Sequence, residues 1–175
     1  MTDLKFKPFV IDEKNRERFE KWTGPDGIAK NHKNGHFVTN PEKSFTPLGK
    51  PLSECRVALV STGGVHLANQ PPYDLLSHDG DWSSREIPGD TPDADFRFSH
   101  SHYDTSEAEK DPNCMFPLAR LRDLANEGYI GGASSLHIGM MGFVPAIENV
   151  LEKTGPEVAQ KLIDAEVDAV LLTPG

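Results

Sequence analysis

The sequence predicts an α/β fold with an open, mostly parallel sheet and flanking helices, of the Rossmann-like or flavodoxin-like type. Two apolar runs, residues 56–60 and 168–172, have the length and composition of buried parallel strands. Segments with helical spacing of apolar residues lie between them, so that strand, helix and strand alternate along the chain. In sheets of this kind, binding sites form beyond the carboxyl ends of the strands.

Residues 1–54 are expected to form an N-terminal arm with a short helix, and residues 55–175 the α/β core. Within the arm, residues 12–22 have the apolar spacing of one helix face, and Gly24 and Pro25 end that helix. The following stretch is polar and rich in Pro and Gly. Both a partner-docking arm and a poorly ordered tail agree with this composition.

Within the core, apolar residues at every third or fourth position predict helices, and alternation with a period of two predicts strands. Proline and glycine mark the boundaries. After the first strand, the expected elements are a long loop at 65–92, a strand at 95–100, a helix at 117–126, a strand at 136–138, a helix at 144–153, a second helix that Pro156 opens, and the strand at 168–172.

Composition narrows the classes of function. The chain has 175 residues, with 18 Lys and Arg against 27 Asp and Glu, and a formal net charge of −9. An acidic balance argues against binding to nucleic acid, which needs clustered basic residues. Two cysteines cannot make a disulfide scaffold, and the sequence shows neither an apolar run of membrane-spanning length nor a hydrophobic leader. A cytoplasmic protein is expected.

The first candidate site is a glycine-rich turn. Residues 61–64 and 173–175 end the two apolar strands and are expected to share one crevice. Gly63 and Gly64 leave the backbone free to approach a ligand, and exposed N–H groups in such a turn can hold a carboxylate or a phosphate. His66 adds an imidazole. A plain tight turn without a ligand is the alternative interpretation.

The second candidate is the segment from His100 to Asp104. If the strand at 95–100 continues, His100, His102 and Asp104 project on the same face and resemble the start of the metallo-β-lactamase motif His-x-His-x-Asp-His. Such side chains are common zinc or iron ligands. The motif's next histidine is replaced by Thr105, and only His137 remains downstream. An acid–base cluster without metal is the other interpretation.

Two further side chains carry open alternatives. Arg85, in the long loop, has a fork that can clamp a substrate carboxylate, but a solvated or locally paired arginine is the competing interpretation. Cys114 stands just before the helix at 117–126, where a helix N-terminus lowers a thiol pKa. A free cysteine can equally be a small buried apolar residue.

These residues fall in five blocks that together resemble a known family. The blocks are VALVSTGGVH (57–66), GDWSSREIP (80–88), SHSHYD (99–104), KDPNCMFPL (110–118) and VDAVLLTPG (167–175). In this order they resemble the selenoprotein B family of glycine, sarcosine and betaine reductases and the related small selenoprotein subunit of D-proline reductase. The resemblance covers residues 55–175, and the short N-terminal part is closer to the proline reductase arrangement.

The resemblance implies reductive cleavage of a C–N bond in glycine, sarcosine, betaine or D-proline. In the family, the pyruvoyl carbonyl of a partner subunit binds the amine substrate and a selenolate attacks the α-carbon. A nearby thiol then resolves the selenide through a mixed selenide–sulfide, and a thiol/disulfide electron donor restores it. A selenol is ionised at neutral pH, which extends the chemistry of activated cysteines.

The resemblance also assigns expected roles. The family's selenocysteine, or its cysteine substitute, follows a strand-end tripeptide such as Thr-Pro-Gly, and this sequence stops at Gly175. The hypothesis is that a selenocysteine codon was read as a stop, which would leave a C-terminally truncated domain, inactive alone. His66 and the glycine turn would face the nucleophile. His100, His102 and Asp104 would supply protons to the leaving amine. Arg85 would orient the substrate carboxylate. Cys114 matches a cysteine of the family by its position in its block.

Three classes of function remain open from the sequence. A selenium- or sulfur-dependent reductase needs no metal or other cofactor in this chain. A metal-dependent hydrolase would use His100, His102 and Asp104. A non-catalytic subunit would bind a larger partner.

Overall fold

The computed structural model describes residues 46–100 and 103–174. The chain divides into two compact units, residues 1–45 and 46–175. The predicted helix at 12–22 and His102 lie outside the described residues, and the division of the chain at residue 54 stays a prediction. Among the described residues, no helix has the length and apolarity of a membrane span.

The second unit contains a five-stranded sheet with β1 (Arg56–Ser61) in its middle. On one side, β1 pairs in parallel with β7 (Ala169–Thr173). On the other, it pairs in parallel first with β5 (Gly132–Ala133) and then with β6 (Leu136–Gly139). The antiparallel strand β3 (Arg85–Pro88) pairs with the outer edge of β6. The expected mixed α/β architecture with a mostly parallel sheet is confirmed.

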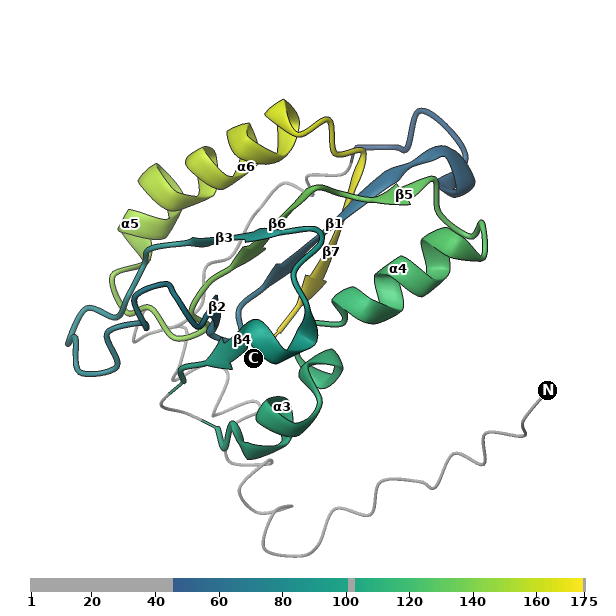
Figure 1. Ribbon diagram of the computed structural model, residues 1–175. Coiled ribbons are helices and arrows are strands. Elements are labelled where there is room, and N and C mark those ends of the chain that lie inside the picture. The colour runs from purple at the N-terminus through teal and green to yellow at the C-terminus, as the bar shows by residue number, and fades with distance from the viewer. Residues whose placement is uncertain (1–45, 101–102, 175) are drawn as a thin grey trace, which may run out of the picture. The chain divides into compact units, whose positions relative to one another are not determined.

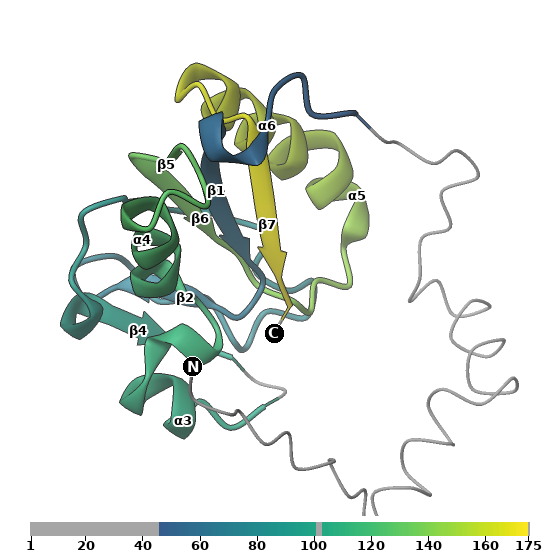
Figure 2. The ribbon, with the colours of Figure 1, turned by 90° about the vertical axis from the view of Figure 1, so that its right-hand side faces the viewer.

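Helices cover both faces of this sheet (Figures 1 and 2). Val57 and Leu59 of β1 pack in one core cluster with α4 (Leu118–Asn126). Ala58 and Val60 point to the other face and pack in a second cluster with α6 (Gly155–Asp164). Alternate residues of one strand thus serve two separate apolar layers, which explains why this strand is an uninterrupted apolar run.

The strands that follow β1 in the sequence lie on both sides of it. The chain passes from β1 through α4 to β5 and β6, and then returns through α6 to β7 on the other side of β1. The strand order therefore reverses between β1 and β7. In open α/β sheets this is the place where binding sites form, beyond the carboxyl ends of the strands.

The prediction of one long loop at 65–92 was wrong. The segment contains β3 and also β2 (Val65–Leu67), which pairs antiparallel with β4 (Phe96–Phe98) in a separate two-stranded sheet. Strands of three or four residues beside polar and proline-rich stretches are too short to show a period of two. The helix α3 (Ser106–Lys110) was missed because it is likewise too short to show the spacing of apolar residues that is typical of a helix.

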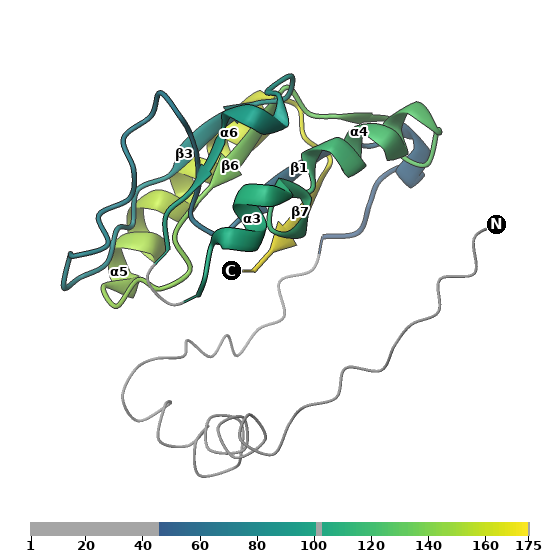
Figure 3. The same ribbon diagram turned by 60° about the horizontal axis from the view of Figure 1, so that its bottom comes forward.

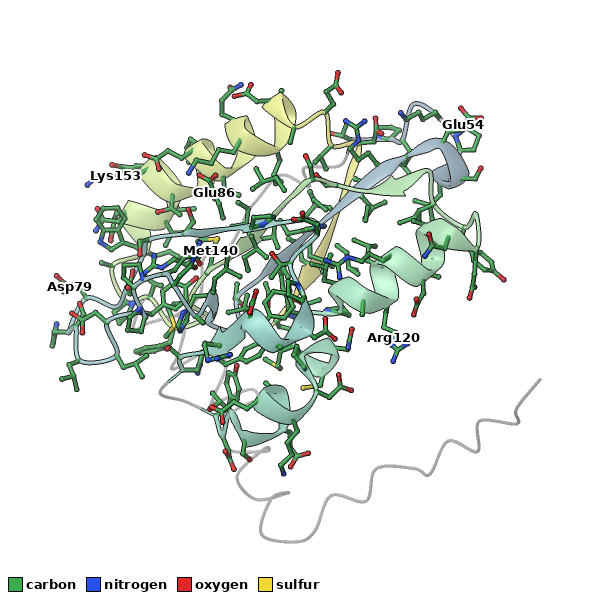
Figure 4. All side chains as sticks on the ribbon, in the orientation of Figure 1. Glu54, Asp79, Glu86, Arg120, Met140 and Lys153 are labelled. Carbon is green, nitrogen blue, oxygen red and sulfur yellow. The ribbon has the colours of Figure 1, made fainter. Side chains whose placement is uncertain are left out.

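The two helices expected near residues 144–164 form one helical run. It consists of α5 (Ile147–Asn149), a π-helical turn (Val150–Thr154) and α6. Pro156 lies in the first turn of α6, as predicted, but it does not separate two helices. The π turn ends at Thr154, two residues before Pro156, which has no N–H and therefore interrupts the regular hydrogen-bonding pattern. Met140, labelled in Figure 4, is half-buried against the second core cluster, whereas Glu54, Asp79 and Arg120 are exposed and point outward.

Candidate functional site

The carboxyl ends of β1 and β7 lie side by side. Five residues of each strand pair in register, with Ser61 opposite Thr173. Directly after the strand, the backbone N–H of Thr62 donates to the carbonyl oxygen of Thr173 at 3.0 Å. The prediction that the two strand ends are neighbours is confirmed. Because the strand order reverses here, this edge of the sheet is the candidate functional site.

One carbonyl group ties a third segment to both strand ends. The Met115 carbonyl oxygen accepts hydrogen bonds from Ser61 Oγ at 3.1 Å and from Thr173 Oγ1 at 2.9 Å. The Ser61 hydroxyl oxygen also accepts from the N–H of Gly63 at 3.1 Å. Met115 follows the 3₁₀ turn Pro112–Cys114, so the exposed residue Cys114 directly precedes a residue that is bonded to both strand ends. Figure 3 shows α3, which precedes this turn, beside the carboxyl end of β7.

The glycine turn is defined by close backbone packing. Gly64 has a φ of +71°, and a Cβ atom there would lie 2.1 Å from the Ser99 carbonyl oxygen. The N–H of Gly64 donates to the Met140 carbonyl at 2.9 Å, as that of Gly63 does to Ser61 Oγ. The carbonyl oxygens are engaged as well, that of Gly63 by the Tyr103 hydroxyl and that of Gly64 by the Ser99 N–H. The amides and carbonyls of both glycines therefore have partners within the chain. Substrate binding by Gly63 and Gly64 stays a prediction.

His66 lies behind the turn, on β2, and is buried. Its Nε2 atom is 2.9 Å from Ser99 Oγ and its Nδ1 atom is 3.0 Å from the Leu67 carbonyl oxygen. A carbonyl can only accept, so Nδ1 carries the proton and the Ser99 hydroxyl donates to Nε2. Both ring nitrogens are thereby engaged inside the fold. A catalytic role for His66 would have to act through Ser99.

Tyr103 brings His100 to the glycine turn. The Tyr103 hydroxyl donates to the Gly63 carbonyl oxygen at 2.5 Å, and its ring lies 4.4 Å, centroid to centroid, from the His100 ring. Burial raises the pKa of Tyr103 to about 12, so its hydroxyl stays a donor at neutral pH. The structure therefore unites Gly63, His100, Tyr103, Met115 and Thr173.

The two-residue period does not extend to Asp104. Strand β4 ends at Phe98, and the Asp104 carboxylate accepts the N–H of Ser106 at 3.0 Å at the start of α3. This hydrogen bond holds the pKa of Asp104 below its ordinary value. Asp104 is thus ionised at neutral pH and is held in a local turn just before α3, whose N-cap residue is Thr105. The condition for a common face, a strand that continues to Asp104, is not met, because β4 ends at Phe98 and the chain turns into α3.

Arg85 lies in a dense local network at the start of β3. Its side chain donates to the carbonyl oxygens of Pro71 and Ser84 and to Ser83 Oγ, at 3.0, 3.1 and 2.6 Å. The guanidinium lies 4.3 Å from the centre of the Tyr73 ring. This geometry resembles the locally paired alternative, and the predicted contact with a substrate carboxylate remains a prediction.

Two other features of the molecule bear on the choice of site. A cavity of about 350 Å³, lined in part by Lys50, Cys55 and Asp168, lies at the amino ends of β1 and β7. Sites in such sheets form at the other end, so this cavity is not the candidate. Within residues 46–100 and 103–174, no group of three or more His, Cys, Asp or Glu is placed to hold a metal ion. The alternative metal site includes His102 and stays a prediction.

Comparison with known proteins identifies the family. Residues 41–175 match the model of the family described as glycine/sarcosine/betaine reductase selenoprotein B. The chain belongs to this selenoprotein B family. The resemblance inferred from the five sequence blocks is thus confirmed, and the family supplies components of reductase complexes.

Three relatives show how far the similarity extends. The D-proline reductase subunit gamma of Acetoanaerobium sticklandii is 43% identical over 135 residues, 77% of this chain and 54% of that protein. The sarcosine reductase complex component B subunit beta of Peptoclostridium acidaminophilum is 33% identical over 73% of this chain and 29% of that protein. The glycine reductase complex component B subunit gamma of Carboxydothermus hydrogenoformans is 30% identical over the same shares, 73% and 29%.

The selenoprotein B chain described here thus spans about half of the first of these relatives and under a third of the other two. No solved structure matches it significantly. Its fold at the candidate site is therefore described from this chain alone.

Sequence reasoning missed three residues of the candidate site: Ser61, Tyr103 and Met115. All three lie in the five sequence blocks, but functional roles were predicted only for their neighbours. Met115 acts through its backbone carbonyl, for which no side-chain pattern exists. Only Ser61 had an available signal, its position at the end of a predicted strand, because Tyr103 and Met115 reach the site through contacts with residues distant in sequence.

Proposed function

We propose that this chain is a subunit of a reductase complex that cleaves a C–N bond reductively in D-proline, glycine, sarcosine or betaine. The observation that carries the proposal is the family match over residues 41–175, whose last matched residues directly follow β7 at the point where the strand order reverses. The relatives named for such reductases include one at 43% identity whose name specifies D-proline. D-Proline is accordingly the first substrate to assay.

The proposal places the nucleophile, a selenocysteine or cysteine, just after Gly175. When present, a selenolate there supplies a nucleophile that is ionised at neutral pH. The surroundings fit such a group. Thr173, three residues earlier, is fixed by its hydrogen bond to Met115 and by the contact of its carbonyl with Thr62. A residue shortly after Thr173 therefore starts from a well-defined position.

The chain's own residues have distinct roles in this proposal. Ser61 and Thr173 hold the strand ends against the turn that carries the exposed Cys114 thiol. Cys114 supplies the thiol of the thiol/disulfide couple, which accepts electrons from an outside dithiol. Tyr103 positions His100, whose imidazole can move a proton to the leaving amine. The electrophilic group that receives the amine, a pyruvoyl carbonyl, belongs to a partner subunit.

Further parts of the proposal concern the whole protein. The core belongs to the doubly wound Rossmann-like or flavodoxin-like type, as the reversal of strand order supports. It is the amino-terminal part of a larger domain, preceded by an arm over residues 1–54, and the protein works in the cytoplasm.

The proposal is tested with the complete reading frame. The frame is expressed with selenocysteine insertion, or with a Cys codon in its place, together with its partner subunit and dithiothreitol. D-Proline, glycine, sarcosine and betaine are then assayed for reductive ring opening or deamination. We expect turnover of one of them and its loss when the residue after Gly175 becomes Ala. Turnover that survives this change would refute the proposed nucleophile.

A further inference from the structure

The outer edge of β7 is unusually apolar for the rim of a sheet. β7 pairs with β1 on one side, and no strand among the described residues pairs with its other side. Three consecutive side chains on it are exposed: Val170 by 41%, Leu171 by 46% and Leu172 by 71%. Figure 2 shows β7 between α4 on one side and α5 and α6 on the other.

These side chains point to both faces of the sheet. Val170 and Leu172 stand beside Ala58 and Val60, which belong to the layer under α6. Leu171 stands beside Leu59, which belongs to the layer that includes α4. A strand that is apolar on both faces is typical of the interior of a parallel sheet, where helices cover each face. β7 has this character although it lies at an edge.

The opposite rim of the same sheet shows how a permanent edge is built. β3 carries Arg85, Glu86 and Pro88, and the Glu86 carboxylate pairs with Lys161 Nζ at 2.8 Å. Charged residues and proline on an edge strand prevent further strands from adding. β7 lacks both between Ala169 and Thr173. The two edge strands therefore differ in composition, and of these two only β7 is suited to pair with a further strand.

We propose that β7 is an interior strand in the complete reductase subunit, where a further strand pairs with its outer edge and apolar side chains cover both of its faces. The occupant is the polypeptide that corresponds to the part of the D-proline reductase subunit gamma outside the matched region, which amounts to nearly half of that protein. Residues 1–40 of this chain are a poorer candidate because they lie outside the family match, whereas β7 lies inside it.

The inference rests on family membership and on the exposed strand, and not on the proposed chemistry. A subunit without reductase activity could still cover β7 in this way, and an active one could leave it bare. Activity measurements and the following test therefore fail independently.

The test compares amide hydrogen exchange in the 175-residue chain and in the full-length D-proline reductase subunit gamma of Acetoanaerobium sticklandii. In this chain, the exchange rate of the β7 amides is divided by that of the β1 amides. In the relative, the same ratio is taken for the two strands that align with β7 and β1. We expect β7 of this chain to exchange on the order of tenfold faster than β1, since one edge is open. In the relative, the two strands should exchange at similar rates.

Two substitutions sharpen the comparison. In this chain, Leu172→Lys should leave the unfolding temperature nearly unchanged because the side chain is already exposed. In the relative, Lys at the position that aligns with Leu172 should open the matching strand to exchange. Leu76→Lys, at an exposed loop position, is the control in this chain, and Lys at the aligned position is the control in the relative.

Other outcomes would overturn the inference. Fast exchange of the matching strand in the full-length relative would show that nothing covers it there. Protection of β7 in the 175-residue chain that disappears when residues 1–45 are removed would identify the arm as the occupant. A dimeric mass by light scattering that becomes monomeric with Leu172→Lys would identify a second copy.

Discussion

The backbone N–H of Leu59 donates a hydrogen bond to the imidazole Nδ1 of His137 at 2.9 Å. Leu59 lies where β1 changes partner, between the pairing of Val57 with Ala133 on β5 and that of Val60 with Ile138 on β6. The side chain of His137 thus supplies the acceptor that a continuous neighbouring strand would provide. A buried N–H at this break would otherwise lack a partner.

This role makes His137 a source of pH-dependent stability. Burial, followed by the nearby Arg122 cation, lowers the pKa of His137 from 6.5 to about 4. The unfolded chain therefore binds the proton more readily, and the contribution of this group is complete above pH 6.5 and is lost as the pH falls towards 4. We expect a loss on the order of 3 kcal/mol in the free energy of unfolding from this group.

His137→Asn separates this effect from the titration of carboxylates. The Asn side chain offers an oxygen acceptor near the position of Nδ1 and does not titrate. Urea unfolding at pH 7 and pH 4.5 should show a smaller difference for the variant than for the natural chain. An equal pH dependence in both proteins would mean that His137 is not buried in its neutral form.

The glycine turn offers a matched pair of substitutions. Gly64 and Gly128 both have positive φ, +71° and +79°, but a Cβ would clash only at Gly64, while nothing lies within 4 Å at Gly128. Gly128→Ala should cost about 1 kcal/mol, from backbone strain alone. Gly64→Ala should cost several times more, at least about 3 kcal/mol, or prevent folding. Thermal unfolding measures both, and equal shifts would contradict the packing described at the turn.

The hydroxyl of Thr173 provides a test of how the strand end is held. Thr173→Val removes the hydrogen bond to the Met115 carbonyl at nearly constant volume, and Thr173→Ser keeps a hydroxyl. We expect Val to lower the stability by about 1 kcal/mol and Ser to retain the bond. In the complete reductase, Val should also lower kcat more than it raises KM, because positioning is lost. Identical kinetics for Val and the natural enzyme would remove Thr173 from the site.

A substitution of Arg85 can tell whether this side chain has a local structural role or contacts the substrate. Arg85→Lys loses the fork that reaches Pro71, Ser83 and Ser84. The structure predicts a loss of stability of about 1–3 kcal/mol, measured by denaturant unfolding. A substrate clamp predicts a different result, with an increase in KM for the amino acid and unchanged stability.

Much of the fold followed from periodicity. The strands around Arg56 and Ala169 are apolar runs, so their parallel pairing and adjacency could be predicted. The predicted burial is confirmed for β1 but was wrong for β7, whose residues Val170–Leu172 are exposed because no strand among the described residues covers its outer edge. The break between β5 and β6 could not, because it depends on an imidazole that replaces a backbone acceptor. β2, β3 and β4 have three or four residues each and owe their pairing to tertiary contacts.

The segments that form the candidate site could be predicted, whereas several of the residues that make its contacts could not. The two strand ends and the glycine turn were predicted to meet at one edge of the sheet, and the pairing of β1 with β7 confirms that the strand ends are neighbours. His66 was chosen for its chemistry, yet packing turns it inward to Ser99. Tyr103 and the Met115 carbonyl were not chosen, because their importance arises from contacts across 40 and more residues of chain.

The central claim is that a selenocysteine or cysteine directly follows Gly175 at the carboxyl end of β7. The most direct measurement is the intact mass and selenium content of the protein produced from its natural gene in a selenium-supplied host. We expect a product longer than 175 residues, with one selenium atom per chain or a cysteine at position 176. A natural product without selenium or cysteine at that position would contradict it.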